Sequence, residues 1–532
     1  MNRTLEARIW ILAGSVGLAL IIGFCAVAIM MLVIAGGGGS SWPPLGYIFG
    51  VTLFTIGQAL ASTALSLIFA LPVALAMARR HDFLGRSLLV ALMILPLGLP
   101  VLPAIFGLVE IWGRQGVVND LLKIAGIDTG FSIYGLGGIL LGHVFFNLPL
   151  AARLMLRALS HVPRREWQLA AGLDFPRFSL FRFVEWPAIV RVLPGIAGLI
   201  FMLCITSFTI VLTLGGGPAT STLEVAIYQA LKFEFDPSRA LLLSLLQLAL
   251  TGLVFILLSW FPDPEQDRTA NAGEPFRPDG KSRPAVLRDV LTIALFALFV
   301  GTPLLAILIS GAQSDLARLL TDSLFHQALR TSLIVAASAG CSAVLLTYLI
   351  ARARLSLSVT RPIGGLFRLP EFTLLIPPLA LGAGWFIFLL KAGVGGNPAV
   401  AMVIAINAVM ALPFTSRILG PELKTHALRT ARLADSLDIH GFARLRIVDW
   451  PALKSPLMTA LSFALALSLG DMGAIALFGS DNFITLPSLL YAKLGSYRTT
   501  DAAGLSLILG TLCLVLMLPA IRTDRRKKEE TA

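Results

Sequence analysis

The sequence predicts an all-α polytopic membrane protein with twelve transmembrane helices, arranged as two fused repeats of six helices each. Two observations support this fold class. Of the 532 residues, 56% are hydrophobic and 14% are charged, whereas a soluble domain carries about a quarter charged residues. A stretch that begins at Trp167 also occurs a second time, beginning at Ala431. A long internal period of this kind indicates that one unit was duplicated and fused.

The predicted helices are apolar segments long enough to cross a hydrocarbon core of about 30 Å, which requires roughly 20 helical residues. The first is longer than the apolar core of a signal peptide, about 7 to 15 residues, so we expect it to be retained. In the first repeat the segments are 9–35, 52–78, 87–112, 136–159, 188–214 and 240–261. In the second repeat they are 287–310, 328–351, 365–390, 398–420, 452–478 and 503–521.

The two halves are expected to comprise residues 1–261 and 287–532, joined by a cytoplasmic linker at 262–286 that is rich in Pro, Asp, Arg and Gly. Within the linker, Gly280-Lys281-Ser282 matches the end of a phosphate-binding loop, but position 275 is Pro where that loop requires Gly. The sequence carries no other nucleotide-binding signature. We therefore expect that this chain does not hydrolyse ATP itself.

The basic residues predict the orientation in the membrane. The net charge is +12, and 33 of the 42 lysines and arginines fall in the segments that lie on the same side as the N-terminus. Cytoplasmic loops carry such an excess, so both termini are expected in the cytoplasm. The same pattern argues against nucleic acid as a partner, because the charge follows the membrane topology. The four cysteines each stand alone in apolar runs, and we expect buried thiols with no metal or redox role.

The repeated stretch lies between the fourth and fifth predicted spans of each half, on the basic side. Residues 167–189 pair with residues 431–453, and each copy ends in valine, an acid, tryptophan and proline, at 184–187 and 448–451. Apolar residues before this ending follow a short helical rhythm. A passive link whose basic residues lie near anionic lipid is the alternative. A passive link gives no reason why the same pattern should occur in both halves.

These residues resemble the permease subunits of bacterial ABC importers with a five-to-six-helix core. In that family a cytoplasmic loop carries Glu-Ala-Ala, then Gly three residues later and Ile-x-Leu-Pro after nine more. It forms a coupling helix that docks on a separate ATPase subunit. Here the ending keeps its spacing, and Asp174 and Asp438 stand at the Gly position. Aspartate is among the residues that form such turns.

The resemblance implies the type I ABC importer permease fold and a location in the bacterial inner membrane. The implied partners are a cytoplasmic ATP-binding subunit, present as a dimer, and a periplasmic substrate-binding protein, with no cofactor and no metal. In the first loop, at about 160–187, it implies a coupling role for Gln168, Ala170, Ala171, Leu173, Asp174, Trp186 and Pro187. In the second loop, at about 424–451, the corresponding residues are Arg432, Ala434, Leu437, Asp438, Trp450 and Pro451.

Within this family the likeness is strongest to fused permeases of thiamine importers. It is carried by Tyr134–Pro149, Phe181–Pro187, Leu214–Pro218, Ala226–Leu231, Gly470-Asp471 and Leu477–Gly479. The implied substrate is thiamine or its phosphate esters. Fused permeases for ferric iron share the architecture and are an alternative. An ion-coupled secondary transporter is a more distant one, since it predicts embedded charges and no repeated docking loop.

Four polar residues in the predicted spans are candidates for the translocation path: His143, Asn407, Ser207 and Asp471. A carboxylate at the centre of a membrane helix costs about 2.5 to 3.5 kcal/mol on insertion scales, so Asp471 can serve a cationic substrate or an outer gate. Hydrogen bonding between helices is the alternative for His143, Asn407 and Asp471. Prolines in two matching spans also predict interrupted helices beside a path: Pro96, Pro100 and Pro103 in the third, and Pro370, Pro377 and Pro378 in the ninth.

Overall fold

The computed structural model describes residues 3–36, 43–93, 95–127, 130, 132–260, 282–357, 367, 370, 373, 376–393, 397–437, 439, 441–480, 482–496 and 498–529. Within these residues the secondary structure is helical, apart from one isolated β-bridge between Ser480 and Phe483. The all-α fold class is therefore confirmed. The predicted linker at 262–286 lies outside the described residues up to position 281.

The helices of the N-terminal part are α1 (Arg3–Gly36), α2 (Leu45–Arg79), α3 (Arg86–Leu92), α4 (Leu95–Gly98), α5 (Val101–Trp112), α6 (Val117–Ile124), α7 (Leu136–Ser160), α8 (Arg164–Gly172), α9 (Arg177–Leu180), α10 (Trp186–Ile205), α11 (Thr209–Leu214), α12 (Leu223–Lys232) and α13 (Pro237–Ser259). The remaining helices are α14 (Arg283–Gln313), α15 (Leu316–Thr321), α16 (Ser323–Ser356), α17 (Pro378–Ala392), α18 (Asn397–Ser436), α19 (Gly441–Arg444), α20 (Trp450–Leu469), α21 (Gly473–Phe478), α22 (Leu486–Gly495) and α23 (Thr499–Glu529). The register that pairs Trp167 with Ala431 also pairs the first residues of α9, α10 and α11 with the first residues of α19, α20 and α21. The sequence repeat is thus also a repeat of helix boundaries.

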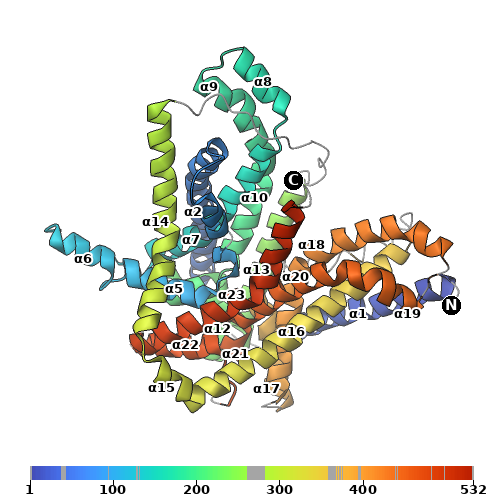
Figure 1. Ribbon diagram of the computed structural model, residues 1–532. Coiled ribbons are helices and arrows are strands. Elements are labelled where there is room, and N and C mark those ends of the chain that lie inside the picture. Colours follow the sequence, from blue (N-terminus) through green and yellow to red (C-terminus); the bar gives the residue numbers. More distant parts are fainter. Residues whose placement is uncertain are drawn as a thin grey trace.

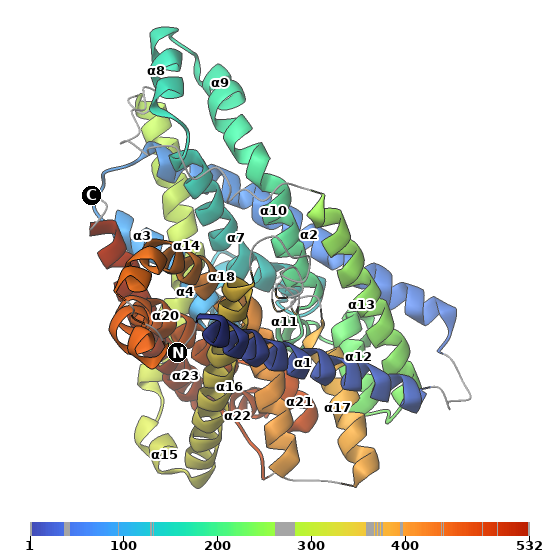
Figure 2. The ribbon, with the colours of Figure 1, turned by 90° about the vertical axis from the view of Figure 1, so that its right-hand side faces the viewer.

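The helices form two bundles, with α2, α7 and α10 at the centre of one and α16, α18 and α20 at the centre of the other. The bundles lie close together at the end where α15 and α22 are found, and they diverge toward α8 and α9 on one side and α19 on the other (Figure 1). Figure 2 looks at the second bundle from its outer end, so that α18 and α20 point toward the viewer while α8 and α9 stand at the top of the first bundle. Both copies of the repeated loop therefore lie at the separated ends of the bundles.

The first helix of each predicted repeat packs against the other repeat. Helix α1 packs along α16 and α17, and α14 packs along α2 and α5. Small residues allow this close approach: a Cβ on Gly107 of α5 would lie 2.3 Å from the Pro303 carbonyl oxygen of α14, and a Cβ on Gly384 of α17 would lie 2.1 Å from the Ala28 carbonyl oxygen of α1. We call α1 and α14 the exchanged helices, because each packs against the other repeat. A glycine lies at the contact of each exchanged helix.

Proline sets where α5 and α17 begin. Pro100 and Pro377 each stand directly before the first helical residue, with extended ψ angles of 143° and 132°. Proline cannot donate the backbone hydrogen bond that would continue a helix through this point. The interruption predicted at these two positions is confirmed. The prediction of one helix over 87–112 is wrong, since the chain forms the short α3 and α4 before Pro100 and the long apolar segment is Val101–Ile124.

Eleven helical segments in the described part of the chain are long and apolar enough to cross a membrane, and α17 is a shorter apolar helix where the ninth span is predicted. The chain is thus a multi-pass membrane protein. The outward faces of α1, α13 and α14 carry exposed leucines, which suits contact with lipid. Cys341 of α16 is also exposed, which corrects the expectation that all four thiols are buried. In a membrane helix, an apolar run includes side chains that face lipid as well as side chains that are buried in the protein, so it does not by itself predict burial.

Candidate functional site

The first copy of the repeated loop folds as a small helical unit at the tip of the first bundle (Figure 1). Pro163 precedes α8 and suits a helix start because it lacks an N–H group. Trp167 and Ala170 of α8 are buried against Leu180 and Val184, in a cluster separate from the main core. The loop therefore has a hydrophobic core of its own, which fixes the orientation of α8.

Helix α8 ends in a left-handed turn at Asp174, whose φ is 47°. The Asp174 N–H donates to the Ala171 carbonyl oxygen at 3.3 Å, and the Phe175 N–H donates to the Ala170 carbonyl oxygen at 3.0 Å. This pair of bonds defines a Schellman motif, in which glycine is the usual residue at the left-handed position. The expectation that aspartate forms this turn is confirmed for Asp174.

In the second loop the Ile439 N–H donates to the Ala434 carbonyl oxygen at 2.9 Å, which is the corresponding bond of the second copy. Asp438 lies outside the described residues, and the Arg432 side chain does too, although its backbone belongs to α18. Unlike the first loop, the second does not begin with a turn. Position 427 is Ala where the first copy has Pro163, so α18 continues without a break through Ser436. The predicted loop at 424–451 therefore begins inside a helix.

Each loop presents an exposed pair of leucines four residues apart. Leu169 and Leu173 are each 66% exposed, and Leu433 and Leu437 are 62% and 60% exposed. We call these four residues the leucine ridges. Leucines at i and i+4 share one helix face, and exposed apolar side chains grouped on a surface mark sites of interaction. Leu169 and Leu433 are not among the coupling residues predicted from the sequence, although their spacing to Leu173 and Leu437 was the signal.

The other predicted coupling residues differ in exposure. Gln168 is exposed and Ala171 is half-buried, whereas Ala170 and Ala434 are each 2% exposed and face the interior. Trp186 and Trp450 open α10 and α20 and are 37% and 50% exposed, and Pro187 and Pro451 follow them in the first helical turn. A π-helical turn precedes each tryptophan, over Phe181–Glu185 and Leu445–Asp449.

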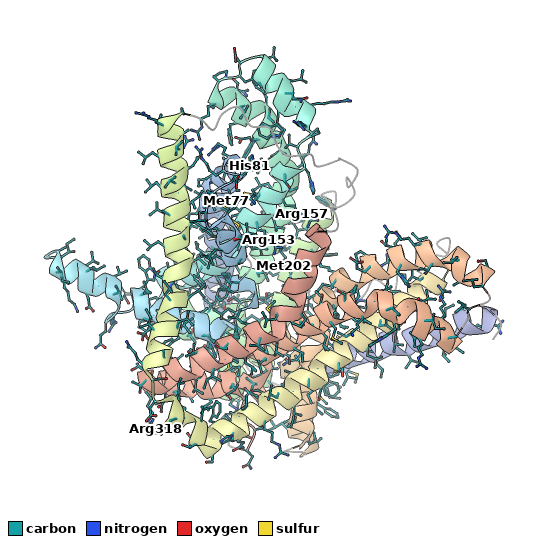
Figure 3. All side chains as sticks on the ribbon, viewed as in Figure 1. Met77, His81, Arg153, Arg157, Met202 and Arg318 are labelled. Atoms are coloured by element: carbon teal, nitrogen blue, oxygen red, sulfur yellow. The ribbon has the colours of Figure 1, made fainter. Side chains whose placement is uncertain are left out.

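Basic side chains gather on the approach to α8. Figure 3 shows His81, Arg153 and Arg157 in the part of the first bundle that leads to α8, and Arg318 at the far end of the molecule near α15.

The predicted path residues His143 and Asn407 make hydrogen bonds between helices. His143 of α7 is buried, and its Nδ1 lies 2.9 Å from Ser62 Oγ of α2. Asn407 of α18 donates from Nδ2 to Ser468 Oγ of α20 at 2.9 Å. Both residues therefore join neighbouring helices of their own bundle, which is the alternative to a place on the translocation path.

Ser207 and Asp471 lie at the breaks that divide the predicted fifth and eleventh spans into two helices each. The Asp471 carboxylate accepts hydrogen bonds from the Gly473 and Ala474 N–H groups, at 3.2 and 3.1 Å. It thereby satisfies N–H groups at the start of α21 that have no partner within the helix. Asp471 and Asn407 also line one small cavity, together with Ser332, Ser468 and Thr485. The structure thus brings these two predicted path residues together.

Sequence reasoning missed Glu224, a second carboxylate in the apolar interior. It lies on α12, is fully buried, and faces the Leu379 backbone N–H of α17. Helix α12 packs against α17, so Glu224 belongs to the contact between the two bundles. The rule that drew attention to Asp471, a carboxylate within an apolar run, applies equally to residues 223–231.

No protein-family model matches the chain. It is similar to the thiamine transport system permease protein ThiP of Brucella abortus strain 2308, with 46% identity over 484 residues, which cover 91% of this chain and 89% of that protein. The protein of the same name from Salmonella typhimurium is 40% identical over 517 residues, which cover 93% of this chain and 95% of the relative. The putative 2-aminoethylphosphonate transport system permease protein PhnV of Salmonella typhimurium is 25% identical over 263 residues, 47% of this chain but 97% of its own length.

A relative of about half the length thus matches along nearly all of its own sequence, as expected when one unit has been doubled. The likeness to the first two relatives covers nearly the whole chain, at 46% and 40% identity. The chain therefore belongs to the family of thiamine transport system permease proteins.

Proposed function

We propose that this chain is the membrane-spanning subunit of an ATP-driven importer that moves thiamine, or its phosphate esters, from a periplasmic binding protein into the cytoplasm. The observation that carries the proposal is the pair of leucine ridges, at the diverging ends of the two bundles. Two separate docking surfaces on one chain suit two ATPase subunits, one for each loop. The names of the relatives supply the substrate.

In this proposal each loop contacts one subunit of a cytoplasmic ATPase dimer. Closure of the dimer on ATP brings the two loops together, and the bundles follow because each loop is built into the end of its bundle. Both termini lie in the cytoplasm, on the same side as the loops. The proposed halves are 1–261 and 287–532, and the periplasmic binding protein docks at the opposite end of the molecule, near α15 and α22.

The path for the substrate is proposed to run past Asp471 and Asn407, which line a small cavity formed by helices of the second bundle. Thiamine carries a positive charge on its thiazolium ring, and a carboxylate beside the path can offset part of that charge. Asp471→Asn keeps the side-chain shape and one acceptor oxygen. We expect it to slow uptake while the chain still inserts and binds the ATPase; normal uptake would remove Asp471 from the path.

The decisive experiment is reconstitution of the chain in proteoliposomes with its ATPase subunit and a thiamine-loaded binding protein. Uptake that requires ATP and both partners is expected. Uptake driven by an ion gradient without ATP would indicate a secondary transporter instead. Stimulation of ATP hydrolysis by a binding protein loaded with ferric iron, and none by the thiamine-loaded protein, would change the substrate but keep the mechanism.

A further inference from the structure

The acid in each repeated ending is buried and faces an arginine at the end of a membrane helix. Glu185 is 2% exposed and Asp449 is 0% exposed. Arg79, in the last turn of α2, places Nη1 3.9 Å from Glu185 Oε1. Arg352, near the end of α16, donates from Nη2 to Asp449 Oδ2. These contacts connect the end of each loop to the second helix of its own repeat.

Each of these arginines also holds the first helix of the other repeat. Arg79 donates from Nε to Oδ2 and from Nη2 to Oδ1 of Asp289 in α14, at 3.1 and 2.9 Å, in a bidentate pair. The Arg352 guanidinium carbon lies 5.0 Å from the ring centroid of Trp10 in α1, within the range of a cation–π interaction. In each repeat, the arginine that contacts the loop therefore also contacts the exchanged helix. The contact is made to a carboxylate in α14 and to an aromatic ring in α1.

The two arginines do not occupy corresponding positions in the repeat. Thr55 and Ser332 do correspond, because their hydroxyls accept the first backbone N–H of α12 and of α22, at 3.0 and 2.8 Å. The register that pairs these two residues also pairs Arg79 with Ser356, so Arg352 stands four residues earlier on its helix. Four residues are about one helical turn and keep the same face. Both repeats therefore make the arginine contact with the loop, although from different turns.

The partners around Asp449 make this contact hard to release. His426 Nε2 lies 2.9 Å from Asp449 Oδ1, and Arg444 Nε lies 3.9 Å from the same oxygen. Moving a buried carboxylate away from its cations leaves uncompensated charge in a medium of low dielectric constant, which is strongly unfavourable. The loop end, the core helix and the exchanged helix are thus expected to move as one body.

The exchanged helices in turn contact helices of their own repeats, because α14 packs along α23 and α1 packs along α13. We propose that Arg79 and Arg352 are positioning residues that join each loop to the first helix of the opposite repeat. A displacement of one loop then moves helices of both repeats. This inference depends on the proposed contact of the loops with the ATPase.

The first test changes the exchanged helix and leaves the loops untouched. Asp289→Asn removes the carboxylate charge, and Trp10→Leu removes the aromatic face. In the reconstituted complex we expect normal co-purification of the ATPase subunit and normal ATP hydrolysis, but thiamine uptake per ATP lower by roughly fivefold. The matched controls are Asp120→Asn, in an exposed pair with Lys123, and Trp260→Leu, at a tryptophan that is 76% exposed. Both controls should retain the wild-type ratio.

The second test separates a positioning role from a merely structural one. Spin labels on cysteines placed at Phe183 and Val290, in a Cys341→Ser background, report the distance between the first loop and α14. This distance should stay constant when ATP is added to the wild-type complex, and it should change with ATP in the Asp289→Asn variant. If Asp289→Asn also lowers the melting temperature, Asp289→Glu restores the carboxylate and should restore the uptake ratio.

Unchanged uptake per ATP in both variants, or a label distance that changes with ATP in the wild type, would overturn the inference. Failure of the ATPase subunit to co-purify with the wild-type chain would instead overturn the proposed function, so the two failures are distinguishable.

Discussion

Replacing one leucine ridge with serine should weaken the binding of the ATPase subunit in a measurable way. Leu169 and Leu173 are each 66% exposed, so a partner can cover about two thirds of each residue. Full burial of a leucine side chain contributes about 1.5 to 3 kcal/mol. Two thirds of that is about 1 to 2 kcal/mol for each residue. The double variant Leu169→Ser/Leu173→Ser is therefore expected to lose about 2 to 4 kcal/mol, or roughly 30- to 700-fold in affinity.

The assay is a titration of the chain in nanodiscs with a fluorescent ATPase subunit, which gives a dissociation constant. Leu84 provides the matched control, because it is fully exposed and lies between α2 and α3, outside the repeated loop. Leu84→Ser should bind as the wild type does. Both leucines are exposed, so replacing them leaves the core of the loop intact, and the variant should fold normally. A double variant that binds the ATPase with wild-type affinity would refute the assignment of the ridge as a docking surface.

Three further substitutions test the local geometry. Asp174→Gly should retain binding of the ATPase because glycine adopts the left-handed turn freely, whereas Asp174→Val should weaken it, since a β-branched residue is strained at a φ of 47°; the same titration measures both. Gly107→Val should lower the melting temperature of the solubilised chain by forcing α5 from α14, at a cost of about 1 to 3 kcal/mol, while Gly301→Ala, with no atom within 4 Å of the added Cβ, should not. Glu224→Gln should raise the melting temperature, because a neutral amide costs less to bury than a carboxylate; a lower value would mean that the carboxyl group has a strongly stabilising partner.

The sequence predicted features that depend on local patterns. Apolar length identified most of the spans, although it failed at 87–112, and the repeat located both loops. The turn at Asp174 followed from the backbone preferences of aspartate. The continuation of α18 through the second loop was also readable in principle, because Ala427 stands where Pro163 ends the helix pattern in the first copy.

Other features depend on partners that are distant in the sequence. Arg79 and Asp289 are 210 residues apart, and each on its own reads as an ordinary charged residue at the end of a membrane helix. Hydrophobic periodicity shows that a helix has an apolar face, but it does not say which helix covers that face. The packing of α1 on the second bundle and of α14 on the first was therefore not predictable, and neither was the placement of Glu224 at the contact between the bundles.

The exchange of first helices has a consequence for how the protein is made. Helix α1 leaves the ribosome early, yet its packing surface on α16 begins at Ser323. At a synthesis rate of about 5 to 20 residues per second, α1 waits on the order of 15 to 60 s for that surface. During this interval its close-packing face is open to lipid or to other nascent helices. The first half therefore cannot complete its assembly before the second is inserted, and a chain terminated between the halves would leave α1 without its partner, as a substrate for membrane proteases.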